Sequence, residues 1–204
     1  DDAWSMACSI DATPSNWWST VIKHKNLKTV LHLQENIGGY RETFQQEPLL
    51  KKSIESGAFS YKFRRTTPHK TGCVCAECVF RENVLNSKKF KDFIINNTNL
   101  KKPVLSETFT SAYYPGDFLG QHTDEKRGIA FIFNLSWKWK PEYGGLLHVE
   151  NELGFQCYVP GWGDLVLLEL GESGKNHFVS EVSPMAPRPR IAISGWYNEG
   201  AIDA

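Results

Sequence analysis

The sequence lacks the long apolar run that a membrane-spanning helix requires. No stretch among its 204 residues approaches the roughly 20 consecutive apolar residues needed to cross a bilayer. The N-terminal residues Asp1–Trp4 also lack a basic region followed by an apolar stretch, so the sequence predicts no signal peptide. We therefore expect a cytoplasmic protein with no membrane partner.

The chain also has no excess of charge of either sign. Its 23 Lys and Arg residues balance 23 Asp and Glu residues, which gives a formal net charge of zero. Proteins that bind nucleic acid usually carry a basic surface, so we expect no nucleic-acid partner. This balance still allows a small anionic ligand that is held by one or two arginines.

Internal repeats, low-complexity tracts and linker-like stretches are absent from the sequence as well. A length of 204 residues fits one domain, and 41% hydrophobic and 23% charged residues are ordinary values for a globular protein. We predict a single domain over residues 1–204, with a helical support region at 1–103 and a β-rich core at 104–204. The sequence does not indicate an oligomeric state.

The first hundred residues predict helices with one strand. Capping residues at Thr13–Asn16 precede the apolar segment Trp17–Ile22, which predicts a helix that begins there. Pro48–Ser56 has apolar residues at helical spacing, and Ser87 is expected to cap a further helix. Aromatic and polar residues alternate over Phe59–Phe63, which predicts a strand.

From Val104 onward the sequence consists of short β-like runs. These runs are Glu107–Tyr114, Ile129–Leu135, Leu146–Val149, Phe155–Val159, Leu165–Leu170, Phe178–Val182 and Ile191–Trp196. Turn segments rich in Gly and Pro separate them. Short strands at this spacing favour a sandwich or jelly roll, so the expected fold class is mainly β with flanking helices.

The segment His122-Thr123-Asp124 contains two potential metal ligands. Residues i and i+2 of an extended segment point to the same side, so both side chains can reach one point. A His from a distant strand would complete the two-His, one-carboxylate face of non-haem Fe(II) oxygenases. His177 is the best third candidate because it directly precedes a β-like run, although such a His is more often simply hydrogen-bonded. The other histidines are placed differently: His24, His32, His69 and His148.

A longer pattern surrounds this metal motif. Tyr113–Asp124 resembles the Tyr-x-x-Gly-x-x-Leu-x-x-His-x-Asp segment of prolyl-4-hydroxylase-like 2-oxoglutarate dioxygenases. Further segments follow in the order of that family: Phe133–Leu135, Glu142–Leu146, Pro160–Val166, His177–Val182 and Arg190–Trp196. The resemblance covers only the C-terminal half of the chain.

The resemblance implies a double-stranded β-helix core, of the jelly-roll or cupin-like type, with Fe(II) held by His122, Asp124 and His177. It also implies 2-oxoglutarate and O₂ as co-substrates and succinate and CO₂ as co-products. Arg190 matches the residue that binds the distal carboxylate of 2-oxoglutarate, which a guanidinium group can meet with two parallel hydrogen bonds. Tyr113 matches a position near the co-substrate. Ascorbate dependence is a tendency of the family that these residues do not address.

Two of these assignments have rivals close by. Arg188 lies two residues before Arg190 and would project to the same side of an extended chain. We prefer Arg190 because it keeps the family's offset to Ile193–Trp196. Tyr114 competes with Tyr113, and a strand aromatic packed in the core is an equally good interpretation of either.

Asp124 also bears on the reaction and on the function. Relatives that halogenate lack the carboxylate ligand, so its presence favours hydroxylation. We predict hydroxylation of an unactivated C–H of an amino acid or related small metabolite, with a protein prolyl or other side chain as the alternative. Two other classes of function compete with an enzyme: a non-catalytic β-barrel binding protein and a zinc-stabilised interaction domain.

Three of the five cysteines lie close to a histidine. The cluster consists of His69, Cys73, Cys75 and Cys78. These residue types hold structural zinc, but Cys-x-Cys-x-x-Cys is not one of the common zinc spacings. We therefore favour a loop with reduced thiols over a zinc site. A substrate-covering loop with the basic residues Arg64, Arg65 and Lys70 is a third interpretation.

Overall fold

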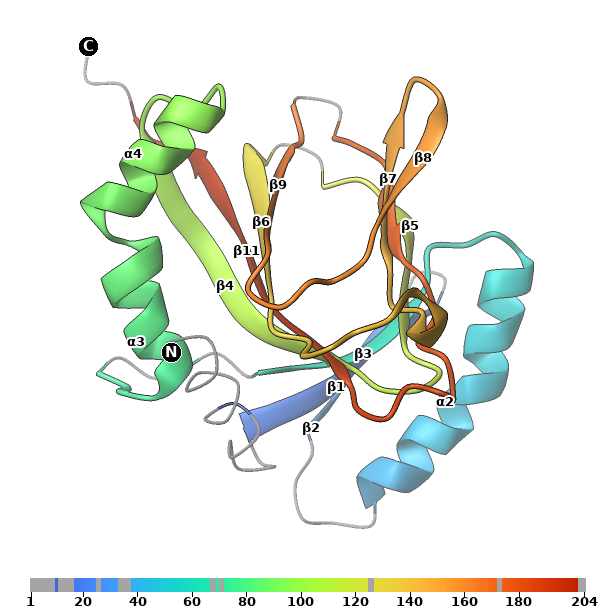
Figure 1. Cartoon of the computed structure of the whole chain (residues 1–204). Helices are drawn as coiled ribbons and strands as arrows, with labels where there is room; N and C mark the ends of the chain where they lie inside the picture. Colours follow the sequence, from blue (N-terminus) through green and yellow to red (C-terminus); the bar gives the residue numbers. More distant parts are fainter. Residues whose placement is uncertain are drawn as a thin grey trace.

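Antiparallel strand pairing organises the chain in the computed structural model, which describes residues 10, 17–24, 27–32, 38–66, 69, 72–124, 127–171 and 174–201 (Figure 1). The strands are β1 (Trp18–His24), β2 (Leu27–His32), β3 (Tyr61–Thr66), β4 (Pro103–Tyr113), β5 (Phe118–His122), β6 (Ile129–Asn134), β7 (Leu147–Asn151), β8 (Gly154–Tyr158), β9 (Leu165–Glu169), β10 (His177–Val179) and β11 (Arg190–Glu199). The helices are α2 (Gly38–Glu55), α3 (Ala76–Phe80), the π-helix η2 (Arg81–Leu85), α4 (Lys88–Asn97) and the 3₁₀ turn η3 (Pro141–Tyr143).

The strands form a curled sheet in the order β8-β7-β10-β5-β3-β4-β11-β6-β9, and β1 and β2 extend it from β3. Figure 1 shows that β4, β11, β6 and β9 form one wall and that β5, β10, β7 and β8 form the opposite wall. This arrangement confirms the predicted mainly β fold with flanking helices and a double-stranded β-helix core.

The period-two alternation of β6 divides the core in two. Ala130 belongs to the cluster between the two walls, whereas its neighbours Ile129 and Phe131 belong to a second cluster on the outer face of the sheet. Successive side chains of a strand point to opposite faces, so one strand contributes to both cores. The inner face is left to line a cavity.

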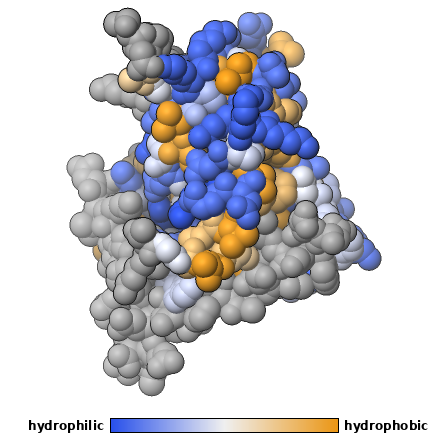
Figure 2. All heavy atoms as spheres, turned by 90° about the vertical axis from the view of Figure 1, so that its left-hand side faces the viewer, coloured by the Kyte–Doolittle hydropathy of each residue, from blue (hydrophilic) through white to orange (hydrophobic). Residues whose placement is uncertain are grey.

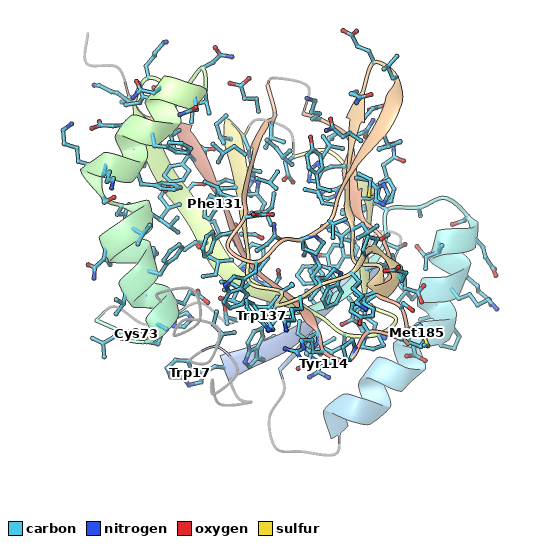
Figure 3. The ribbon with its side chains drawn as sticks, in the orientation of Figure 1. Trp17, Cys73, Tyr114, Phe131, Trp137 and Met185 are labelled. Atoms are coloured by element: carbon cyan, nitrogen blue, oxygen red, sulfur yellow. The ribbon has the colours of Figure 1, made fainter. Side chains whose placement is uncertain are left out.

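Helices α3, η2 and α4 cover the outer face of β4, β11 and β6 (Figure 1). Ser87 caps α4 as predicted, since its Oγ accepts a hydrogen bond of 3.1 Å from the backbone N–H of Phe90. The fully buried Tyr197 of β11 donates its hydroxyl to the backbone carbonyl of Leu85 at 2.6 Å. Figure 3 shows Phe131 on the sheet wall beside this helical layer. The contacts hold the helices against the wall that contains β11.

The predicted helix over Trp17–Ile22 is wrong. The segment forms β1, which pairs with both β2 and β3 in antiparallel register. Three consecutive β-branched residues, Thr20–Ile22, favour a strand over a helix. Pairing of Val21 with Phe63 buries both side chains, and this tertiary contact outweighs the capping signal. The capping residues Thr13–Asn16 themselves lie outside the described residues.

The expectation of only one strand in the first hundred residues is also wrong, because β1 and β2 form in addition to β3. The predicted helix at Pro48–Ser56 and the predicted strand at Phe59–Phe63 are confirmed. Helix α2 contains Pro48–Glu55, and β3 overlaps the alternating segment Phe59–Phe63. β3 lies between β5 and β4, so residues before 104 contribute a strand to the sheet around the cavity. The division into a support region at 1–103 and a core at 104–204 stays a prediction.

The face formed by the helical layer is mainly hydrophilic, with an apolar group at the level of α3 (Figure 2). Val74 and Val79 are exposed in this part of the chain. Among the described residues, no helix has the length and apolar character that crossing a membrane would require.

Candidate active site

Strand pairing brings the three predicted ligands together. His122 ends β5 and lies opposite His177, the first residue of β10, and Asp124 follows β5 by two residues. The Nε2 atoms of the two histidines lie 3.7 Å from Asp124, His122 from Oδ1 and His177 from Oδ2. One donor atom of each of the three residues lies within 4.8 Å of the others. A metal ion with bonds of about 2.0–2.2 Å can reach donor atoms at such separations.

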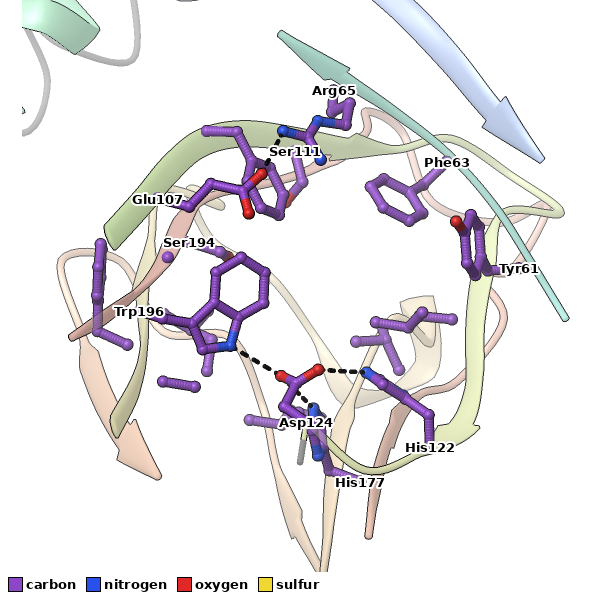
Figure 4. Close-up of a pocket in the computed structure, with 18 of the residues that line it drawn as sticks. Tyr61, Phe63, Arg65, Glu107, Ser111, His122, Asp124, His177, Ser194 and Trp196 are labelled. Atoms are coloured by element: carbon purple, nitrogen blue, oxygen red, sulfur yellow. Dashed lines mark hydrogen bonds and ion pairs between the residues drawn. The ribbon is translucent and has the colours of Figure 1, made fainter. Parts of the chain in front are cut away.

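Hydrogen bonds orient each of these side chains. Nδ1 of His122 lies 2.9 Å from the carbonyl oxygen of Gly120, and Nδ1 of His177 lies 2.7 Å from that of Lys175. A carbonyl oxygen only accepts, so each Nδ1 carries the proton and each Nε2 lone pair faces Asp124. The indole Nε1 of Trp196 donates to Asp124 Oδ2 at 2.9 Å (Figure 4). The donor set is therefore arranged for a metal cation.

Glycine is needed at position 120 for this geometry. A Cβ there would lie 2.5 Å from the carbonyl oxygen of Ser60, because β5 approaches the segment before β3 at this point. The backbone N–H of Gly120 donates to the same oxygen at 2.8 Å, and the carbonyl of Gly120 accepts from His122. The close approach of the two backbones thus holds Gly120 in place, and the carbonyl of Gly120 orients His122.

Burial, with a further contribution from the neighbouring His177, lowers the pKa of His122 to about 4. The imidazole is then neutral near pH 7, which is the form that binds a metal. A neutral His122 also agrees with the hydrogen bond at Nδ1, which leaves the lone pair on Nε2.

A cavity of about 340 Å³ opens beside the three ligands. Its lining includes all five residues that the sequence assigned to the site: His122, Asp124, His177, Arg190 and Tyr113. Aromatic and aliphatic side chains from both walls form most of the remainder (Figure 4). The predicted residues therefore converge on one space, although the chain separates them widely.

Arg190 is buried in this lining with only 3% of its surface exposed. Its Nη2 makes one long contact of 3.4 Å with Oδ1 of Asn134, and its Nε has no hydrogen-bond partner. Within the described part of the chain, no carboxylate forms an ion pair with it. Burial lowers the pKa of Arg190, yet arginine keeps its charge in proteins. A buried guanidinium without a counter-ion is costly unless a ligand supplies the negative charge.

The structure distinguishes the two rival pairs. Tyr113 is 4% exposed and lies beneath Arg190, whose guanidinium carbon is 5.2 Å from the centre of its ring. Burial raises the pKa of Tyr113, so its phenol stays protonated and able to donate. Tyr114 is 37% exposed outside the cavity, and Arg188 is also exposed. Tyr113 and Arg190 are thus the members of each pair that face the site.

Sequence reasoning named Arg65 as a possible substrate-contacting residue, but it missed Glu107 and the charged wall that the two residues form with Arg127 across the cavity from the ligands (Figure 4). Glu107 of β4 accepts from Arg65 of β3 at 2.9 Å and lies 3.8 Å from Arg127. The two guanidinium groups lie over the aromatic rings of Phe109 and Trp196, respectively. Alternation in β4 was the only available signal, because it places residue 107 on the same face as Phe109.

Comparison with known proteins finds a family model that is similar to part of this chain. Residues 108–198 match the family model described as the 2OG-Fe(II) oxygenase superfamily, which confirms the resemblance seen in the sequence. The family uses Fe(II), 2-oxoglutarate and O₂, and the donor set and the unpaired Arg190 fit the metal and the co-substrate. No curated protein is similar enough to this chain to count as a match.

Three solved structures share the fold at low sequence identity. An oxidoreductase of the 2OG-Fe(II) oxygenase family from Burkholderia pseudomallei is 11% identical, with a TM-score of 0.57, over 98% of this chain and 92% of its own. A Trichoplax adhaerens prolyl hydroxylase in complex with a hypoxia inducible factor peptide fragment is 16% identical, with a TM-score of 0.52, over 97% of this chain and 90% of its own. The viral collagen prolyl hydroxylase of Paramecium Bursaria Chlorella virus-1 is 15% identical, with a TM-score of 0.51, over 77% of this chain and 91% of its own. At these identities the likeness shows the fold alone.

Proposed function

We propose that this protein hydroxylates an unactivated C–H of an amino acid or a related small metabolite, and the match of residues 108–198 to the 2OG-Fe(II) oxygenase model supports this proposal. One observation carries the proposal. The two-His, one-carboxylate face and a buried guanidinium without a counter-ion line the same cavity. The first suits Fe(II) with open positions, and the second suits the distal carboxylate of a bidentate 2-oxo acid.

Each residue has a separate task in this proposal. His122, Asp124 and His177 would hold Fe(II), and Arg190 would bind the distal carboxylate of 2-oxoglutarate with Tyr113 as a nearby donor. When bound, iron and 2-oxoglutarate supply the activation of O₂ that oxidises the C–H, with succinate and CO₂ as co-products. The apolar lining keeps water away from the reacting carbon and orients it.

Asp124 supports hydroxylation over halogenation. Its carboxylate occupies the ligand position that a halide would need, and the hydrogen bond from Trp196 holds it there. Loss of this carboxylate would also leave the partly buried Trp196 indole N–H without its acceptor.

The charged wall supports an amino acid as substrate. Arg65 and Arg127 flank one carboxylate, Glu107, so the wall carries a net positive charge opposite the metal face. A substrate carboxylate can bind to the guanidinium groups, and a substrate ammonium group can bind to Glu107. A protein prolyl side chain is the alternative, because the related Trichoplax prolyl hydroxylase was solved with a peptide fragment.

Succinate formation from 2-oxoglutarate under air, with Fe(II) added, tests this function. A panel of free amino acids and a matched panel of peptides that contain the same residues would be compared, with the His122→Ala variant as control. We expect a free amino acid to stimulate turnover and to gain one oxygen atom. Stimulation by peptides alone would move the substrate to proteins, and neither binding nor turnover of 2-oxoglutarate would favour a non-catalytic binding protein.

A further inference from the structure

The cysteine cluster lies at the opposite side of the sheet wall from the active-site ligands. Cys73 and Trp17 mark this corner of the molecule in Figure 3. One donor atom from each of His69, Cys73, Cys75 and Cys78 lies within 4.8 Å of the others. The cluster thus converges on a point, which a plain loop with reduced thiols does not require.

Two separations within the cluster are close to the N···S edges of a tetrahedral zinc site. Nδ1 of His69 lies 3.5 Å from the sulfur of Cys73 and 3.2 Å from that of Cys75. A zinc ion with bonds of about 2.0–2.1 Å to nitrogen and about 2.3 Å to sulfur gives N···S edges of roughly 3.5 Å. The histidine is therefore spaced from two of the cysteines as zinc would hold it, and all four donors lie close enough to share one ion.

A buried carboxylate stands behind the histidine. The far nitrogen of His69, Nε2, is buried without a hydrogen-bond partner and lies 3.4 Å from Oε1 of Glu77. Glu77 is 5% exposed, and Thr66 and Thr110 donate to its other oxygen, Oε2, at 2.9 and 2.5 Å. Histidines that bind zinc commonly donate their second N–H to a carboxylate, and Glu77 is the carboxylate that lies nearest to this nitrogen.

From these observations we propose that His69, Cys73, Cys75 and Cys78 form a second metal site, which holds Zn²⁺. Binding converts the three thiols to thiolates and releases their protons to solvent, while His69 binds through Nδ1 and keeps its proton on Nε2. Four protein ligands leave no position for substrate, so the zinc is structural. The unusual ligand spacing made the sequence favour a loop without metal, and the folded geometry reverses that preference.

The zinc site supports one wall of the active-site cavity. Glu77 connects the cluster to Thr66 at the end of β3 and to Thr110 in β4. The adjacent residues Arg65 and Ser111 line the cavity. Zinc thus fixes the end of β3 beside the charged wall, and its loss is expected to raise the KM for the substrate more than the KM for 2-oxoglutarate. Lys70, considered above for a substrate-covering loop, lies outside the described residues.

Metal content tests the site directly. The full chain would be purified under reducing conditions from zinc-supplemented medium, desalted with a weak chelator and analysed for zinc. We expect one tightly bound zinc ion per chain. Cys73→Ser should weaken zinc binding at least 10-fold, and Cys157→Ser, which alters an exposed cysteine outside the cluster, should bind zinc as the wild type does. Cobalt substitution should give the thiolate charge-transfer and tetrahedral ligand-field bands in the wild type and in Cys157→Ser.

Controls separate the zinc site from the iron site and from misfolding. Since the proposal is independent of the proposed function, His122→Ala should keep its zinc whatever its activity. Added Zn²⁺ should raise the Tm of wild-type protein that has been stripped with a strong chelator, which needs no variant to fold. A wild-type protein that retains no zinc, and whose Tm and thiol reactivity do not respond to added Zn²⁺, would overturn the proposal.

Discussion

The two ligand clusters of this protein differ in how the chain builds them. The active-site cluster takes its ligands from two paired strands and the segment after one of them, and it has three ligands that face a cavity. The cysteine cluster takes four ligands from a single short segment beside α3. Three ligands leave room for exchangeable groups on a metal, whereas four close the shell. One site is suited to chemistry, and the other is suited to holding the backbone.

The surrounding hydrogen bonds differ in the same sense. The active-site histidines donate to backbone carbonyls, and Arg190 lines the same cavity with its Nε buried and without a hydrogen-bond partner. His69 faces the buried carboxylate of Glu77, which is bonded in turn to β3 and β4. Hydrogen bonds through Glu77 thus connect the cysteine cluster to the sheet. In the candidate active site, the buried charge of Arg190 is left for the proposed co-substrate.

The largest expected effect comes from removing an active-site ligand. His122→Ala should lower succinate formation by more than about 100-fold, because a lost ligand costs more than the roughly 10–100-fold loss seen for outer-shell partners. The Tm and the zinc content should stay near the wild-type values. Zinc loss in this variant would show that the two clusters are not independent.

Arg190→Gln should have the next largest effect. A charge-assisted hydrogen bond contributes about 1.5–3 kcal/mol, so the KM for 2-oxoglutarate should rise by about 10–150-fold. Arg188→Gln is the matched control, because this exposed neighbour does not line the cavity and should behave as wild type. Equal effects of the two substitutions on KM would refute the assignment of the co-substrate site.

Glu77→Gln examines the support of the cysteine cluster. The amide keeps the size of the side chain but removes the charge that faces His69, so zinc affinity should fall by roughly 10–100-fold. Competition with a chromophoric chelator measures that change. Unchanged affinity would mean that Glu77 only anchors α3 to β3 and β4.

Tyr113→Phe is expected to have the smallest effect. Loss of one neutral hydrogen bond costs about 0.5–1.5 kcal/mol, which corresponds to a rise of about 2–12-fold in the KM for 2-oxoglutarate. The exposed Tyr114→Phe serves as control. A Tyr113→Phe variant with the wild-type KM would leave Tyr113 as a packing residue beneath Arg190.

The fold of the C-terminal half could be predicted because its strands carry short alternating patterns between Gly- and Pro-rich turns. The N-terminal segment Trp17–Ile22 could not, because capping signals act locally whereas the partner of β1, the strand β3, lies more distant in sequence. β-branched residues at 20–22 were the available signal for a strand.

The active-site residues could be predicted because the motif order carries information that spacing alone lacks. His122 and Asp124 share an extended segment, and His177 was chosen from its place before a β-like run, but only the resemblance pointed to Arg190. The charged wall was hidden, since Glu107, Arg65 and Arg127 meet only after β3 and β4 pair. The sequence did not favour a zinc site at the cysteine cluster, because its ligand spacing is uncommon. The spacing of cysteines along the chain does not show where the folded loop places their sulfur atoms.

Binding of 2-oxoglutarate without substrate or oxygen tests the central claim most directly. Anaerobic calorimetry would titrate 2-oxoglutarate into the Fe(II)-loaded wild type, His122→Ala and Arg190→Gln. The account predicts one binding site per chain in the wild type that depends on Fe(II), is lost in His122→Ala and is strongly weakened in Arg190→Gln. A wild type that does not bind 2-oxoglutarate, or variants that bind it equally well, would contradict the assignment of this cavity as an iron and 2-oxoglutarate site.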